Sequence, residues 1–130
     1  MKTILVDAVY TLVSETGELN HEMFNLLESY PNPKLVVSNA PLEMFCKYNL
    51  DKLSYKVFTL QRNPLKTDPN YFLMLFEEEN LSVNDVIYFE HDSASVESAQ
   101  SVGIIAHHYN EHTKDLVALK KFLDENVASE

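Results

Sequence analysis

The 130-residue sequence is poor in glycine and cysteine, and each shortage narrows what the chain can be. Its only glycines are Gly17 and Gly103, which excludes the glycine-rich loops that cradle phosphates in many nucleotide-binding proteins. Its one cysteine, Cys46, allows no internal disulfide, as is typical of proteins in a reducing compartment. No signal-peptide pattern precedes the first apolar run, so we expect a cytoplasmic protein.

Positive charge is also scarce, because 10 lysines and arginines stand against 20 aspartates and glutamates, for a net charge of −10. A field of this sign repels nucleic acid and anionic membranes, so neither is expected as a partner. The sequence contains no apolar run long enough to span a bilayer. A phosphorylated ligand would need a bound cation or a local basic group to offset the negative field.

Short apolar runs alternate with segments of helical periodicity along the whole chain. Strands are expected at residues 3–6, 35–37, 55–60, 85–90 and 104–106. Helices are expected to begin near Asn20, Pro41, Asp68–Pro69, Ser93 or Ser95, and Thr113. This alternation predicts one α/β domain over residues 1–130, with a five-stranded parallel sheet and helices on both faces.

Polar side chains follow several of the predicted strands at the point where each strand ends. Asp7 follows the first strand and Ser38–Asn39 the second, while Lys66 precedes a helix and Asp92 follows the fourth strand. Ligands of open parallel sheets bind beyond the carboxyl ends of the strands. Two carboxylates that lie close together repel each other when both are ionised, and a divalent cation bound between them would remove this repulsion. Because all the expected ligands are oxygens, Mg²⁺ is the favoured ion. With Lys66 and Ser38 to hold anionic oxygens, the set suits phosphoryl transfer.

Four motifs in this order resemble those of the haloacid dehalogenase-like (HAD) superfamily. An apolar strand followed by D-x-D-x-T-L corresponds to Asp7-Ala8-Val9-Tyr10-Thr11-Leu12, and a strand ending in Ser or Thr corresponds to Leu35-Val36-Val37-Ser38-Asn39. The K-P-D-P motif corresponds to Lys66-Thr67-Asp68-Pro69. A strand ending in G-D or D-D, with V-E-x-A-x-x-x-G after it, corresponds to His91-Asp92-Ser93 and Val96-Glu97-Ser98-Ala99 to Gly103.

The resemblance implies a three-layer α/β/α Rossmann-like core and a role for each matched residue. Asp7 would be the nucleophile that forms an aspartyl-phosphate intermediate. The carboxylates of Asp7 and Asp92 and the backbone carbonyl of Val9 would bind Mg²⁺. Ser38, with Asn39 beside it, and Lys66 would bind the transferring phosphoryl group.

The sequence also departs from the family pattern at three positions of the site. The second aspartate of the first motif, which protonates the leaving group and activates water, is Val9 here, and such a loss typically costs about 10²–10⁴-fold in rate. The usual glycine before the threonine is Tyr10, and His91 replaces a glycine or aspartate beside the predicted metal carboxylate. The spacing after Asp92 is one residue shorter than in many relatives.

The segment from Leu12 to Lys34 is too short to hold the cap domain that closes over small substrates in this family. We therefore expect a capless, Mg²⁺-dependent phosphohydrolase of the phosphatase type with weakened acid–base catalysis. Its substrate would be a phosphorylated small molecule or a phosphoprotein. The alternatives are a catalytically impaired relative that binds a phosphorylated ligand or partner and, less favoured, a dehalogenase.

Overall fold

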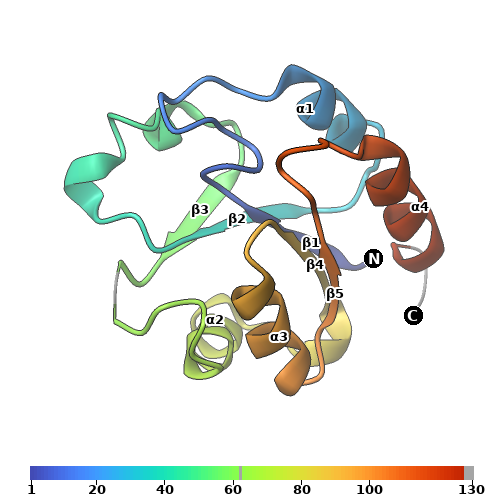
Figure 1. Cartoon of the computed structure of the whole chain (residues 1–130). Helices are drawn as coiled ribbons and strands as arrows, with labels where there is room; N and C mark the ends of the chain where they lie inside the picture. Colours follow the sequence, from blue (N-terminus) through green and yellow to red (C-terminus); the bar gives the residue numbers. More distant parts are fainter. Residues whose placement is uncertain (62, 128–130) are drawn as a thin grey trace.

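A computed structural model describes residues 1–61 and 63–127, which form a parallel five-stranded sheet between two layers of helices (Figure 1). The strands are β1 (Thr3–Asp7), β2 (Lys34–Ser38), β3 (Lys56–Thr59), β4 (Val86–Glu90) and β5 (Ile105–His108). They lie in the order β3-β2-β1-β4-β5. The predicted α/β/α Rossmann-like architecture is therefore confirmed.

Helices cover both faces of the sheet, as side-chain alternation along the central strand requires. The helices are α1 (His21–Glu28), α2 (Asn70–Glu79), α3 (Ser93–Ser101) and α4 (Leu116–Asn126). Ile4 and Val6 on β1 pack in one cluster with residues of α1 and α4. Leu5 points the other way and packs with residues of α2 and α3 (Figure 1). In the part of the chain that the structure describes, no helix is both long and apolar enough to cross a membrane.

Strand β1 is the centre of the sheet, and its register brings two carboxylates level with each other. Val6 of β1 pairs with Phe89 of β4, so Asp7 and Glu90 come next on adjacent parallel strands. On the other side of β1, Asp7 pairs with Val37 of β2, and Ser38 follows it. The ends of the three central strands therefore present Asp7, Glu90 and Ser38 at one edge.

The helix starts and stops follow local capping signals. Asn20 accepts a hydrogen bond from the Met23 amide, which confirms it as the N-cap of α1. Helix α4 begins at Leu116, three residues later than predicted, because the Asp115 side chain caps it by accepting from the Ala118 amide. Gly103 has a φ of +92°, in the left-handed region, directly after α3 and its C-cap residue.

The predicted helix from Pro41 is wrong. This segment contains only two short 3₁₀ turns, Leu42–Met44 and Leu50–Lys52. Asn49 lies between them with a φ of +56°, which an α-helix cannot contain. Of the apolar residues that indicated a helix, Leu50 is buried and Phe45 and Tyr48 pack against the core, whereas Leu42 is exposed.

Candidate functional site

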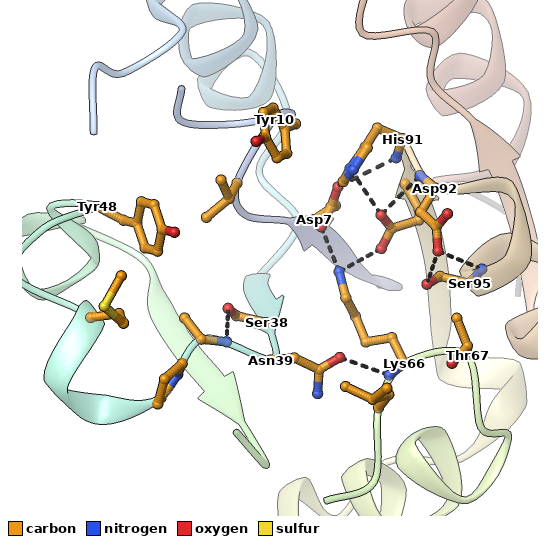
Figure 2. Close-up of a pocket in the computed structure, with 16 residues that line it drawn as sticks. Asp7, Tyr10, Ser38, Asn39, Tyr48, Lys66, Thr67, His91, Asp92 and Ser95 are labelled. Carbon is orange, nitrogen blue, oxygen red and sulfur yellow. Dashed lines mark hydrogen bonds and ion pairs between the residues drawn. The ribbon is translucent and has the colours of Figure 1, made fainter. Parts of the chain in front are cut away.

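A cavity of about 430 Å³ lies at the carboxyl ends of the central strands (Figure 2). The residues that line it divide by side-chain chemistry into two groups, named the polar side and the apolar side. The polar side consists of Asp7, Ser38, Asn39, Lys66, Thr67, Glu90, His91, Asp92 and Ser95. The apolar side consists of Val9, Tyr10, Ala40, Pro41, Met44, Tyr48 and Leu65. The strand ends that the sequence singled out thus line one cavity.

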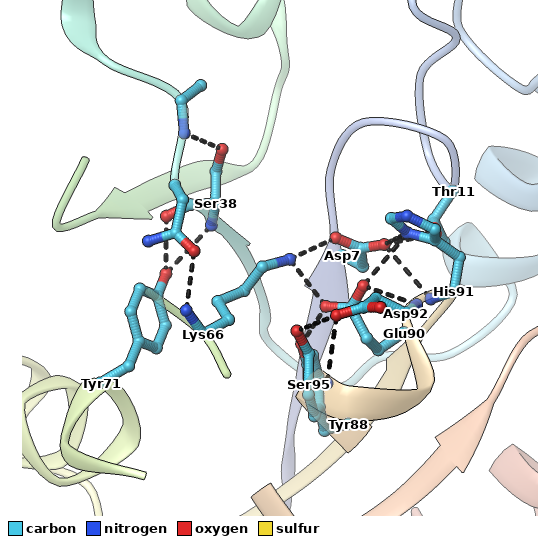
Figure 3. A network of polar contacts seen from close by, with 12 residues as sticks. Asp7, Thr11, Ser38, Lys66, Tyr71, Tyr88, Glu90, His91, Asp92 and Ser95 are labelled. Carbon is cyan, nitrogen blue, oxygen red and sulfur yellow. Dashed lines mark hydrogen bonds and ion pairs between the residues drawn. The ribbon is translucent and has the colours of Figure 1, made fainter. Parts of the chain in front are cut away.

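Asp7 is at the centre of the polar side and is only 1% exposed. Its Oδ1 accepts from Lys66 Nζ at 2.6 Å, and its Oδ2 accepts from Thr11 Oγ1 at 2.6 Å and contacts His91 Nδ1 (Figure 3). Burial raises the pKa of Asp7, but the Lys66 ammonium and the bond from His91 outweigh it and hold this pKa well below its usual range. Asp7 is therefore a carboxylate, the form that a nucleophile requires.

Lys66 joins Asp7 to a second carboxylate. Its Nζ lies 2.6 Å from Asp7 Oδ1 and 2.6 Å from Glu90 Oε1. Figure 3 marks both contacts as dashed lines. Burial lowers the pKa of Lys66, but the two carboxylates raise it by more, and the net pKa is above its ordinary value. The Lys66 backbone amide donates to Asn39 Oδ1 at 2.7 Å, which fixes where the lysine leaves its loop.

Glu90 is the second carboxylate, and the sequence analysis missed it. It is fully buried at the end of β4 and accepts from Lys66 Nζ, the Tyr88 hydroxyl and the Asp92 amide. Burial and the nearby charge of Asp7 raise the pKa of Glu90. The sequence signal for Glu90 was the acidic residue that ends an otherwise apolar strand. The motif spacing, one residue short after Asp92, was a separate sign that Asp92 is not the matching residue.

His91 contacts both carboxylates through one ring nitrogen. Its Nδ1 is in hydrogen-bond contact with Asp7 Oδ2 and lies 3.1 Å from Glu90 Oε2. Burial lowers the pKa of His91, but its hydrogen bonds to the two carboxylates and their charges raise it overall to about 10. At neutral pH the ionised Asp7 therefore lies beside two cationic side chains, those of Lys66 and His91.

The structure does not bring Asp92 into the cluster around Asp7. Asp92 is the N-cap of α3, and its Oδ2 accepts from the Ser95 amide at 3.2 Å and from Ser95 Oγ at 2.7 Å. Its own amide donates to Glu90. Glu90 and His91 thus stand beside Asp7 where Asp92 was predicted, because β4 ends at Glu90 and the helix begins only three residues later.

Ser38 and Asn39 line the cavity, and both also fix the backbone around it. Ser38 Oγ accepts from the Ala40 amide at 2.9 Å. The buried Tyr71 hydroxyl accepts from the Ser38 amide at 3.0 Å and donates to the Ser38 carbonyl at 2.8 Å. Asn39 Nδ2 donates to the Pro64 carbonyl at 3.1 Å, so its side chain connects β2 to the Lys66 loop.

Tyr10 adopts a backbone conformation that favours glycine. Its φ is +71°, which costs a residue with a side chain some strain. The side chain is 47% exposed, its ring lies 5.4 Å from that of His91, and its hydroxyl donates to Glu15. Tyr10 therefore lines the cavity together with Val9, on the side of His91.

No protein-family model matches the sequence, and no curated protein matches it. Solved structures do match the fold. A HAD-family enzyme from Bacteroides thetaiotaomicron, an aspartate-to-alanine mutant in complex with magnesium and inorganic phosphate, is 11% identical with a TM-score of 0.65 over 85% of this chain and 95% of its own. The core domain of a candidate phosphoglycolate phosphatase from Streptococcus pneumoniae is 16% identical with a TM-score of 0.61 over 95% of each chain.

A candidate β-phosphoglucomutase from Thermotoga maritima is 15% identical with a TM-score of 0.55 over 83% of this chain and 85% of its own. At such identities the likeness is one of fold. The chain has the core fold of the HAD-like superfamily, which the motifs in its sequence predict.

The Bacteroides enzyme that shares this fold is in complex with magnesium, and in the described part of this chain Asp7, Glu90 and His91 form the side-chain group that could hold a cation. Among the described residues, one ligand atom from each lies within 4.8 Å of the others. The set fits Mg²⁺ poorly, because Mg²⁺ prefers oxygen ligands and one of the three atoms is a nitrogen. In addition, Lys66 Nζ and His91 Nδ1 already contact the carboxylates that the ion would join.

Proposed function

We propose that the protein is a HAD-like phosphohydrolase with Asp7 as its nucleophile. The observation that carries this proposal is a buried, ionised Asp7 in a cavity at the carboxyl edge of the sheet, with Lys66 on one oxygen. Lys66 and Ser38 line the same cavity and would bind the oxygens of a phosphoryl group. The phosphatase-type and mutase-type proteins that share the fold support this reading.

The reaction follows from these positions in two steps. Oδ1 of Asp7 attacks phosphorus, the bond from phosphorus to the leaving oxygen breaks, and the leaving group departs with the bond's electron pair. Water then attacks the phosphorus of the aspartyl phosphate, the bond from phosphorus to Oδ1 breaks with its electron pair on Oδ1, and the protons of the water leave with inorganic phosphate as the carboxylate is restored. Lys66 offsets the charge that develops on the phosphoryl oxygens in both steps.

The leaving group receives no proton from the position that normally supplies one, because Val9 carries no ionisable group. We therefore expect substrates whose leaving oxygen is weakly basic, such as aryl phosphates. The apolar side of the cavity, with Met44, Tyr48 and Leu65, suits the hydrocarbon part of such a substrate. The cavity volume of about 430 Å³ is that of a small-molecule site and would also admit a phosphorylated side chain of a protein.

Magnesium dependence stays a prediction of the family resemblance. The resemblance gives the ligands as Asp7, the Val9 carbonyl and Asp92, whereas the side chains that cluster in the structure are those of Asp7, Glu90 and His91. A divalent ion bound at this edge of the sheet would neutralise phosphoryl charge. The steps above use only this chain's own residues, because the fit of the cluster to Mg²⁺ is poor.

A second function, binding of a phosphorylated ligand without turnover, is favoured by one specific observation. Asp7 Oδ2 is engaged by both Thr11 and His91, and Oδ1 is engaged by Lys66. A carboxylate held in this way is a weaker nucleophile than a free one. Such a protein would bind inorganic phosphate and leave aryl phosphates intact.

Hydrolysis of p-nitrophenyl phosphate and of an alkyl phosphate by wild type, Asp7→Asn and Val9→Asp tests the proposal. We expect slow hydrolysis of the aryl ester by wild type and none by Asp7→Asn. Val9→Asp should accelerate the alkyl ester much more than the aryl ester, because only the alkyl leaving group needs an acid, whose contribution is typically about 10²–10⁴-fold.

Val9→Asn is the matched control, since it adds a polar group of similar size that cannot donate a carboxyl proton. If Val9→Asn increased the rate of alkyl phosphate hydrolysis as much as Val9→Asp, restored acid catalysis would be ruled out. Activity that persists in Asp7→Asn would overturn the proposal. Phosphate binding without turnover in wild type would instead establish the second function.

A further inference from the structure

His91 lies between the two carboxylates, Asp7 and Glu90, whose negative charge a metal ion would otherwise offset. Its Nδ1 contacts Asp7 Oδ2 and lies 3.1 Å from Glu90 Oε2, so one ring nitrogen faces two carboxylates that belong to neighbouring strands. Lys66 Nζ contacts the other oxygen of each carboxylate, Oδ1 of Asp7 and Oε1 of Glu90. Two cationic side chains thus join the two carboxylates: Lys66 contacts Asp7 Oδ1 and Glu90 Oε1, and His91 contacts Asp7 Oδ2 and Glu90 Oε2 (Figure 3).

Direct contact between His91 and Asp7 also limits what else can lie there. A metal ion bound to both atoms would stand about 2 Å from each and would push them apart. A nitrogen that faces two carboxylate oxygens carries a hydrogen, whereas a nitrogen that ligates a metal cannot. The observed arrangement is therefore that of a donor and not that of a metal ligand.

Several contacts hold the imidazole in this place. The His91 amide donates to Asp7 Oδ2 at 3.3 Å, and the His91 carbonyl oxygen lies 2.8 Å from His108 Nε2. Tyr10 packs near the ring, with the two ring centres 5.4 Å apart. The His91 side chain is 20% exposed, so it is fixed by neighbours and still reaches the cavity.

We propose that His91 replaces the divalent cation of this fold, so that Asp7 and Glu90 are bridged by its imidazole and the site binds anionic phosphoryl groups without a metal. The proposal rests on the proposed function only for the identity of the site, and it holds for a hydrolase and for a phosphate-binding protein alike.

Binding of Mn²⁺, followed by the loss of the electron paramagnetic resonance signal of the free ion, tests the proposal without any turnover. Wild type should leave this signal unchanged at millimolar Mn²⁺. His91→Asp should bind about one ion per chain, displaced by excess Mg²⁺, because it restores an all-oxygen set with Asp7 and Glu90. His112→Asp is the matched control: it makes the same substitution at a side chain that is 87% exposed, and it should bind no ion tightly.

Tight binding of Mn²⁺ by wild type would overturn the proposal, and so would a folded His91→Asp that binds none. If His91→Asp does not fold, His91→Ala serves instead, since loss of the ring also opens the two carboxylates to an ion. A wild-type protein that binds Zn²⁺ but not Mn²⁺ would make His91 a ligand of a softer metal and would also overturn it.

Binding of inorganic phosphate to wild type, measured by calorimetry with excess chelator or with Mg²⁺, gives an independent result. Equal affinities in the two conditions would support a site that works without a metal. Affinity that appears only with Mg²⁺ would overturn the proposal. Absence of phosphate binding in both conditions would overturn the metal-free phosphate site and the proposed function together, whereas turnover that fails beside intact phosphate binding would affect the proposed function alone.

Discussion

Lys66 and Asp7 are 59 residues apart in the chain, and Lys66 Nζ lies 2.6 Å from Asp7 Oδ1. The same Nζ lies 2.6 Å from Glu90 Oε1, so one ammonium serves two buried carboxylates. Removing one partner of a buried ion pair typically costs about 3–5 kcal/mol, because the other charge is left without compensation. We therefore expect Lys66→Met to lower the free energy of unfolding by about this amount, as measured by urea denaturation.

Lys56→Met is the control for this substitution. Lys56 Nζ lies 2.9 Å from Glu79, but its side chain is 68% exposed, and exposed pairs contribute about 0–1 kcal/mol. Equal losses in the two variants would show that the effect comes from lysine removal in general and not from the buried cluster.

Most of the fold could be predicted from the sequence, because the parallel strands are short, buried apolar runs and the helices carry local start signals. Asp7, Ser38 and Lys66 could be predicted as cavity residues for the same reason, since they follow or precede such elements directly. Glu90 was missed, because it is the last residue of β4 and was therefore assigned to the strand and not to the site.

Glu90 and Asp92 are two residues apart, and a single sequence does not determine which of them lies beside Asp7.

The prediction of a helix from Pro41 was wrong for a different reason. The apolar residues of the segment from Pro41 to Lys52 have helical spacing, but they serve the cavity wall and the core edge, and Asn49 in the left-handed region prevents a continuous helix. Tertiary packing thus overrides a local pattern there.

Tyr71→Phe should destabilise the protein at Ser38, which lines the cavity. The buried hydroxyl bonds both the amide and the carbonyl of Ser38, and the substitution removes it without changing the shape of the ring. An unsatisfied buried backbone group costs about 1–3 kcal/mol, so we expect a loss of unfolding free energy in this range. Tyr55→Phe, which removes an exposed bond to Glu28, should cost less. A similar loss in both variants would contradict a special role for the Tyr71 hydroxyl.

Asp92 is expected to act as a helix cap and not as a metal ligand. Asp92→Ala should destabilise the protein by about 0.5–2 kcal/mol, because the Ser95 amide and hydroxyl lose their acceptor. Asp92→Ser should retain most of the stability, since serine caps almost as well as aspartate. Thermal unfolding of both variants, with and without Mg²⁺, is the measurement. A stabilisation of wild type by Mg²⁺ that both variants lose would instead make Asp92 a metal ligand.

The pH dependence of stability should carry the signature of His91. Its pKa is raised from 6.5 to about 10 in the folded chain, where Asp7, Glu90, Tyr10 and His108 are its neighbours. Below pH 6.5 the folded and the unfolded chain both hold the proton, and the stabilisation by His91 is complete. Between pH 6.5 and 10 only the folded chain holds the proton. The free energy of unfolding therefore falls as the pH rises in this range, by at most about 1.4 kcal/mol per pH unit. Urea denaturation at several pH values should show this fall in wild type and a shallower one in His91→Gln. The difference between the two proteins removes the contribution of the other groups that titrate in the same pH range. Parallel curves for the two proteins would mean that His91 does not hold its proton against the two carboxylates.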